Sequence, residues 1–96
     1  MRYSLQGIAF EWDARKADAN RGKHGVDFEL ACEAFFDPFL RVLDAGSEGG
    51  EMRQAIVGLT THWQFLYVVF VERDEVLRII SARPATPAER RFYEDP

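Results

Sequence analysis

Hydrophobic and polar residues alternate over residues 8–12, which read IAFEW. A period of two is typical of a strand with one buried face, so we predict a strand there. Asp13 follows at once and is a good N-cap, and a short helix is therefore predicted from residue 14 to about residue 21. This helix is mostly polar, with only a thin seam of alanines.

A different period governs the next segment. Apolar residues spaced by three and four form one stripe there: Phe28, Ala31, Cys32, Phe35 and Phe36. Such a stripe predicts an amphipathic helix, which begins after Asp27 and ends at Pro38. This helix has the apolar face needed to pack on a sheet.

The second half of the chain is a series of short apolar segments with turn residues between them. Strands are predicted at residues 39–44, 53–60, 64–72 and 76–83. The glycine-rich segment 45–50 and the turns at 60–63 and 73–75 separate them. Connections this short imply a meander of antiparallel neighbours.

The chain then turns sharply from its last strand into a final helix. Pro84 cannot extend a strand ladder, and it ends the strand. Thr86, Pro87 and Glu89 form the sequence of a helix N-terminus with a capping box. The prediction is an α+β fold: a small antiparallel sheet of about four to five strands, two N-terminal helices packed on it, and a short C-terminal helix.

Residues 65–71, which read FLYVVFV, are apolar at both parities. Both faces of that strand therefore need cover. The amphipathic helix can cover one face, and the other must be covered by the C-terminal helix or by a second protein chain.

Composition narrows the class of protein. At 96 residues, with 47% hydrophobic residues, the chain is one small domain with a real core. A net charge of −4 means that any nucleic-acid role needs a local positive site. The single cysteine, Cys32, is expected to be an inert core thiol, and the chain shows no signal peptide and no membrane-length apolar segment, so a cytoplasmic location is expected.

Two histidines are candidates for chemistry. Lys23 and His24 stand between Gly22 and Gly25, where the backbone can approach a ligand closely, and histidine is suited to proton transfer near neutral pH. The alternative is a histidine that only hydrogen-bonds a carbonyl at the end of its helix. His62 is predicted to be structural or solvated, and no metal site or cofactor is expected, because no ligand spacing surrounds either histidine.

Arginines provide the other candidate groups. Arg53 opens one predicted strand, and Arg78 and Arg83 lie on another. Arg78 and Arg83 have opposite parity and are expected on opposite faces unless a bulge intervenes. Arg83, with Arg90 and Arg91 of the next helix, can form an anion site, although solvated or ion-paired arginines explain the same pattern.

If these groups converge, they allow metal-free cleavage of RNA. The ribose 2′-OH attacks its own phosphate, a base takes the proton, cations stabilise the added negative charge, and an acid protonates the leaving 5′ oxygen. The sequence has no catalytic serine triad, no phosphate-binding P-loop and no dinucleotide-binding motif.

The order of motifs resembles one family. These motifs are FEWD at residues 10–13, Asn20, KHGVDFELA at residues 23–31 with Phe36 and Asp37, Glu51-x-Arg53 before a strand containing Gly58, and RIISARPAT at residues 78–86 with Glu89, Arg90 and Tyr93. Together they are similar to the BrnT-type toxins of bacterial type II toxin–antitoxin systems.

The resemblance implies a single RelE-like toxin domain over residues 1–96 and a metal-independent endoribonuclease that arrests translation. It implies a cognate BrnA-like antitoxin with a ribbon-helix-helix part, so that DNA is bound only through the complex. Carried over by position, the catalytic candidates are Lys23, His24, Arg53, Arg78 and Arg83. The C-terminal helix adds Arg90, Arg91 and Tyr93 as residues that bind the RNA substrate.

A second class of function fits the same residues. The chain can be a non-catalytic module that docks a protein through its apolar sheet face while its arginines pair with acids. DNA binding by this chain alone fits poorly, because the first helix is too short and too mixed in charge for a recognition helix.

Overall fold

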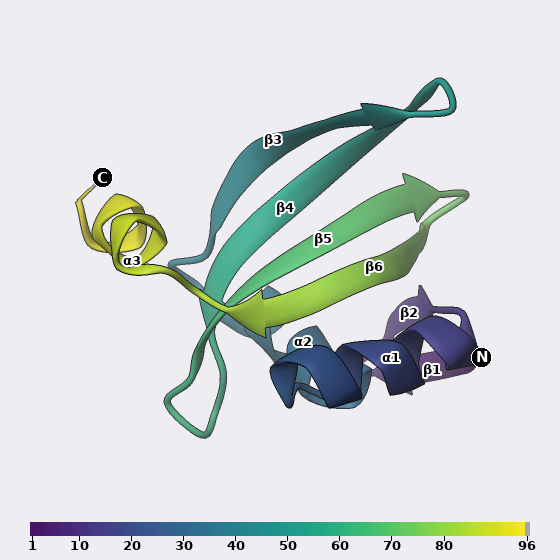
Figure 1. Ribbon diagram of the computed structural model, residues 1–96, viewed down its shortest axis with the longest axis horizontal. Helices are drawn as coiled ribbons and strands as arrows, with labels where there is room; N and C mark the ends of the chain where they lie inside the picture. The colour runs from purple at the N-terminus through teal and green to yellow at the C-terminus, as the bar shows by residue number, and fades with distance from the viewer. Residues whose placement is uncertain (96) are drawn as a thin grey trace.

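Six strands form one sheet, and three helices pack around it (Figure 1). The computed structural model describes residues 1–95. The strands are β1 (Arg2–Leu5), β2 (Ile8–Glu11), β3 (Arg41–Glu48), β4 (Glu51–Leu59), β5 (Phe65–Arg73) and β6 (Val76–Pro84). The helices are α1 (Ala14–His24), α2 (Phe28–Glu33) with a 3₁₀ turn η1 (Ala34–Phe36), and α3 (Pro87–Glu94).

The strand order is β1-β2-β6-β5-β4-β3. Strands β3 to β6 form the predicted antiparallel meander. The prediction of a purely antiparallel sheet of four to five strands is wrong at the N-terminus. There, β1 pairs with β2 in a hairpin, and β2 lies parallel to β6 through a short contact of Phe10 with Leu77 and Glu11 with Arg78.

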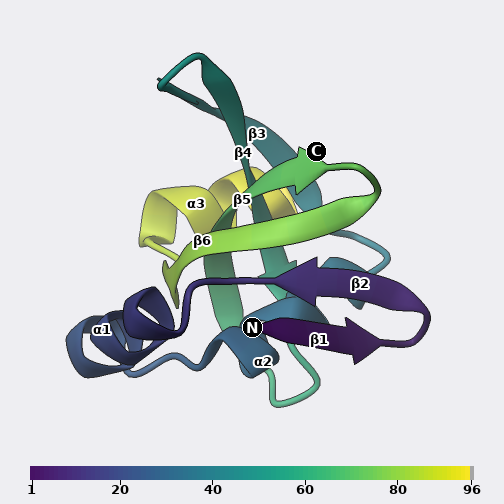
Figure 2. The same ribbon diagram turned by 90° about the vertical axis from the view of Figure 1, so that its right-hand side faces the viewer.

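Helices α1 and α2 cover one face of the sheet, as predicted (Figure 2). Aromatic rings from the N-terminal half meet the central strands there: Phe35 packs edge-on against Phe10 and Phe70, and Trp12 packs against Phe28. Cys32 is buried in this core, as expected, and its pKa is raised to about 12 by burial. The thiol is therefore uncharged at neutral pH.

The observed ends of the helices agree better with the capping residues than with the periodicity of the apolar residues. Asp13 caps α1 by accepting hydrogen bonds from the backbone of Arg15 and Lys16, as predicted. The helix continues past the predicted end at residue 21 to His24, because Gly22 is accommodated within it and Gly25 provides the left-handed C-cap (φ 70°). The second predicted helix is divided into α2 and η1.

Strand β3 also differs from its prediction. It runs through most of the predicted glycine-rich loop, because its register with β4 shifts between Asp44 and Ser47 and lets the ladder continue to Glu48. Gly49 and Gly50, both with positive φ, make the turn.

The opposite side of the sheet is called here the α3 face. It is defined by cross-strand partners that point away from α1 and α2: Ala55, Val57, Tyr67, Val69, Ser81 and Arg83. Helix α3 lies at one end of this face (Figure 1), where Tyr93 packs edge-on against Phe65 with ring centroids 5.1 Å apart. The C-terminal helix thus supplies part of the second cover that residues 65–71 were predicted to need.

Candidate active site

A buried asparagine fixes the end of α1 against β6. The Asn20 side chain accepts a hydrogen bond from the Ala82 N–H (3.1 Å) and donates to the carbonyls of Ala82 (2.8 Å) and Val26 (3.0 Å). Ala82 lies on the part of β6 beyond its short pairing with β2, so the asparagine amide takes the place of a neighbouring strand. His24 is one helical turn beyond Asn20, and this anchor places it beside the end of β6.

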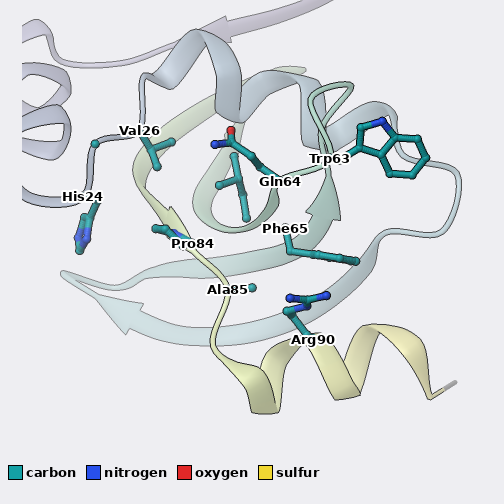
Figure 3. Close-up of a pocket in the computed structure, with 10 residues that line it drawn as sticks. His24, Val26, Trp63, Gln64, Phe65, Pro84, Ala85 and Arg90 are labelled. Atoms are coloured by element: carbon teal, nitrogen blue, oxygen red, sulfur yellow. The ribbon is translucent and has the colours of Figure 1, made fainter.

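His24 lines a pocket of about 330 Å³ at that end of the sheet (Figure 3). The ring is half-buried, and within residues 1–95 its nitrogens form no hydrogen bond, so the alternative of a ring tied to a helix-terminal carbonyl is not what is seen. Lys23 is exposed. The other residues of the pocket come from the segment between α1 and α2, from the β4–β5 turn and the start of β5, from the end of β6 and the segment after it, and from α3: Gly25, Val26, Trp63, Gln64, Phe65, Leu66, Pro84, Ala85 and Arg90.

Arg90 faces this pocket from α3. Its guanidinium carbon lies 4.4 Å from the centroid of the Phe65 ring, below that ring in Figure 3. His24 lies on the other side of Pro84 and Ala85. A histidine and an arginine that are distant in sequence therefore share one cavity.

Arg83 immediately precedes the pocket residue Pro84 and lies on the α3 face. Its guanidinium forms a two-pronged ion pair with Glu89, with both N–O distances 2.8 Å, and lies 4.2 Å from the centre of the Tyr67 ring. These hydrogen bonds lower the pKa of Glu89 and keep it ionised. Glu89 also accepts from the backbone of Thr86, so the predicted capping box of α3 and the arginine fork share one carboxylate.

Arg78 lies on the same face as Arg83, because β6 has the bulge that was named as the exception to opposite faces. In the ladder with β5, Ser81 is opposite Val69 but Ile79 is opposite Phe70, so Ile80 is an inserted bulge residue that changes the parity. Arg78 is opposite Val71, and their common face is the α3 face. The separation of Arg78 from Arg83 is about four strand steps, roughly 13 Å.

Arg53 lies near Arg78 and far from His24. By parity with Ala55 it points to the α3 face, where it pairs with Glu48 (2.9 Å), while Arg78 pairs with Glu11 (2.7 Å). The five predicted catalytic residues are thus placed in two groups. Lys23, His24 and Arg83 are at the pocket end, and Arg53 with Arg78 is toward the other end, with a carboxylate on each of the three arginines.

The predicted RNA-binding residues of α3 also separate. Arg90 lines the pocket, Arg91 is exposed, and Tyr93 is turned toward η1, where its hydroxyl donates to Asp37 (2.6 Å). Partial burial and this carboxylate raise the pKa of Tyr93 to about 12. Tyr93 holds α3 in place, whereas Arg90 faces the cavity.

Comparison with known proteins decides the family. Residues 12–89 match the profile of the ribonuclease toxin BrnT of type II toxin–antitoxin systems. The chain belongs to the BrnT family. This span includes α1, α2, β3 to β6 and the beginning of α3.

A solved BrnT structure agrees with this assignment. The ribonuclease toxin BrnT of Brucella abortus has 25% sequence identity to this chain and a TM-score of 0.57, with 80% of this chain and 95% of that chain covered. No curated protein sequence matches the chain. The α+β fold with a six-stranded mixed sheet and three helices is therefore a BrnT fold.

Membership makes this chain part of a family of ribonuclease toxins, and a type II toxin family implies an antitoxin partner. None of the helices formed by residues 1–95 is long and apolar enough to cross a membrane. Over the same residues, no group of three or more histidine, cysteine or acidic side chains is gathered as metal ligands would be.

The sequence patterns did not single out several residues at the candidate pocket and on the α3 face. Trp63 and Phe65 line the pocket. Arg41 lies on the α3 face, where it donates a hydrogen bond to the Phe92 carbonyl (2.9 Å) and stacks on the Phe92 ring. The sequence marks these residues only weakly as functional, because Arg41 is a single charged residue at the start of a strand and Trp63 is a turn residue. Glu89 was recognised as a cap but not as the partner of Arg83.

Proposed function

We propose that this BrnT-family protein is a toxin that cleaves RNA without a metal ion, arrests translation and is neutralised by a cognate antitoxin. The observation that supports this most is the shared cavity of His24 and Arg90, beside Arg83 at the end of β6. The proposal includes a single RelE-like toxin domain over residues 1–96, acting in the cytoplasm.

In the proposed reaction, a base takes the proton of the ribose 2′-OH, and the 2′ oxygen attacks the adjacent phosphorus. The bond from phosphorus to the 5′ oxygen breaks as an acid protonates that oxygen, and a 2′,3′-cyclic phosphate forms. His24 is suited to move a proton, since its ring nitrogens form no hydrogen bond within residues 1–95 and an imidazole can both accept and donate a proton. Arg83 and Arg90 are suited to hold the phosphate, because guanidinium groups donate several fixed hydrogen bonds to its oxygens. Arg91 can add affinity from α3.

The remaining candidates fit a longer path for the RNA backbone. Arg53 and Arg78 lie on the same sheet face as Arg83, and a chain that crosses this face from the pocket end meets them next. Lys23, one residue before His24, is exposed beside the pocket. A phosphate must compete with Glu48, Glu11 and Glu89 for Arg53, Arg78 and Arg83.

The antitoxin is proposed to be BrnA-like, with a ribbon-helix-helix part, so that DNA is bound only by the complex. This finer assignment rests on the resemblance of the motifs and on the membership of the family. The test is co-purification with the product of the neighbouring reading frame, followed by binding of the complex and of each protein alone to operator DNA.

The ion pairs favour a second function. Arg53, Arg78 and Arg83 each form an ion pair with a carboxylate. In a non-catalytic protein-binding module, the arginines are expected to pair with acidic side chains in this way instead of binding a phosphate. A growth-arrest assay separates the two functions. Arrest that is lost in Arg83→Ala and kept in Arg73→Ala, whose arginine pairs with Glu51 far from the pocket, supports the nuclease. No arrest at any level of expression supports the module.

A further inference from the structure

Trp63 is unusually exposed for its size. It lies in the β4–β5 turn with 82% of its surface exposed, whereas the other tryptophan, Trp12, is 2% exposed. Its backbone has a positive φ of 61°, a conformation that side chains other than glycine and asparagine seldom adopt. A large apolar side chain on a strained turn residue is a reason to look for a ligand.

The turn that carries Trp63 is held by a dense set of hydrogen bonds. The Trp63 N–H donates to the Thr60 carbonyl (3.0 Å), and the Thr60 hydroxyl accepts from the backbone of His62 and Gln64. The Thr61 hydroxyl donates to Glu33 of α2 (2.6 Å). The turn is therefore fixed to the body of the protein, and the entropic cost of ordering its backbone when a ligand binds the indole is small.

The surroundings of Trp63 match the chemistry of a nucleotide. Trp63 and Phe65 line the same pocket as His24 and Arg90, and in Figure 3 both aromatic rings extend to the same side of the turn. Aromatic side chains stack on nucleobases, and cationic side chains bind the phosphates that link successive nucleotides. The pocket is lined by both kinds of group.

We propose that Trp63 is a stacking platform for one nucleobase of the RNA, adjacent to the phosphate held near His24 and Arg90. This inference rests on the proposed ribonuclease function. It also specifies the substrate class: the base must be free of a duplex, because its face is accessible to an indole only in single-stranded RNA.

The test is steady-state cleavage of a short single-stranded RNA by the full chain. In Trp63→Ala the Michaelis constant should rise about 5- to 100-fold with little change in kcat, since stacking on an aromatic residue contributes to binding. Trp63→Phe should retain most of the affinity. Phe39→Ala, which removes an exposed aromatic ring outside the pocket, should match the wild type.

Tryptophan fluorescence provides a second readout that does not depend on turnover. RNA should quench the emission of the wild type, and it should leave the emission of Trp63→Ala unchanged, because the buried Trp12 is then the only tryptophan. Quenching in the wild type keeps the test decisive even if Trp63→Ala folds poorly.

Two results would overturn the inference while leaving the nuclease intact. One is a wild type that cleaves RNA together with a Trp63→Ala variant of unchanged Michaelis constant and no quenching. The other is a Trp63→Ala variant that cleaves normally but binds the antitoxin more weakly, which would make the turn a protein contact. A wild type that cleaves no RNA would instead remove the proposed function, and this inference with it.

Discussion

Replacing Asn20 with alanine should destabilise the protein strongly, because one side chain satisfies three buried backbone groups. Asn20→Ala leaves the Ala82 N–H and the carbonyls of Ala82 and Val26 without their partners. Asn20 is 7% exposed and Ala82 is 0% exposed, so water does not easily replace the lost bonds. At roughly 1 kcal/mol for each group, the free energy of unfolding should fall by about 3 kcal/mol.

A loss of this size is large for a domain of 96 residues, whose whole free energy of unfolding is expected to be about 5–15 kcal/mol. At roughly 4–8 °C for each kcal/mol, Tm should fall by about 12–24 °C. Urea unfolding followed by circular dichroism measures the free energy, and a thermal scan measures Tm. Asn20→Asp should also be strongly destabilised, because a carboxylate cannot donate to the two carbonyls.

Lys16→Ala is the matched control, since it changes an exposed residue of the same helix and should shift stability by less than about 0.5 kcal/mol. If Asn20→Ala is as stable as Lys16→Ala, then the asparagine does not hold α1 to β6. The placement of His24 at the pocket would lose its structural basis.

Three other predictions concern the core and the arginine fork. Arg83 lowers the pKa of Glu89 below its ordinary value of 4.5, so the stability from this pair is present above pH 4.5 and is lost as pH falls through the lower pKa of the folded state. When Tm is measured against pH, the Tm of Glu89→Gln should therefore fall less on acidification than the Tm of the wild type. An identical acid dependence of the two proteins would refute this. Gly58→Ala should lose about 1–3 kcal/mol of stability in urea unfolding, because the new Cβ would lie 2.6 Å from the Ala34 carbonyl oxygen; an unchanged urea midpoint would show that η1 does not pack there. Cys32 should react with a thiol reagent only after denaturation, and fast labelling of the folded protein would contradict its burial.

Local patterns in the sequence predicted most of the secondary structure. The cap at Asp13, the capping box of Thr86 and Glu89, and the four-strand meander are all present. These features depend on residues that are close in sequence, so local rules are sufficient to find them.

The parts of the fold that were missed depend on long-range pairing. Strand β1 has only four residues and no strong pattern, and the parallel contact of β2 with β6 involves two pairs of residues. The bulge at Ile80 leaves no clear signal in the sequence, yet it determines that Arg78 and Arg83 share a face. A single inserted residue thus changed the expected position of a candidate group.

The sequence predicted which residue types form the candidate site, but it did not predict which of these residues come together in space. His24 and Arg90 were selected from the sequence, but their approach to one pocket depends on the anchor at Asn20 and on the docking of α3 by Tyr93. The carboxylates that hold the arginines could not be assigned either, because sixteen acidic residues were available as partners.

The most direct measurement is single-turnover cleavage of a short single-stranded RNA by the purified protein in the presence of a metal chelator. The wild type and Arg73→Ala should cleave and leave a 2′,3′-cyclic phosphate, and His24→Ala should be slower by a factor of about 100 to 10,000, the usual contribution of a positioned acid or base. Cleavage by His24→Ala at the wild-type rate, in a variant with unchanged Tm, would mean that the pocket at the end of β6 is not the active site.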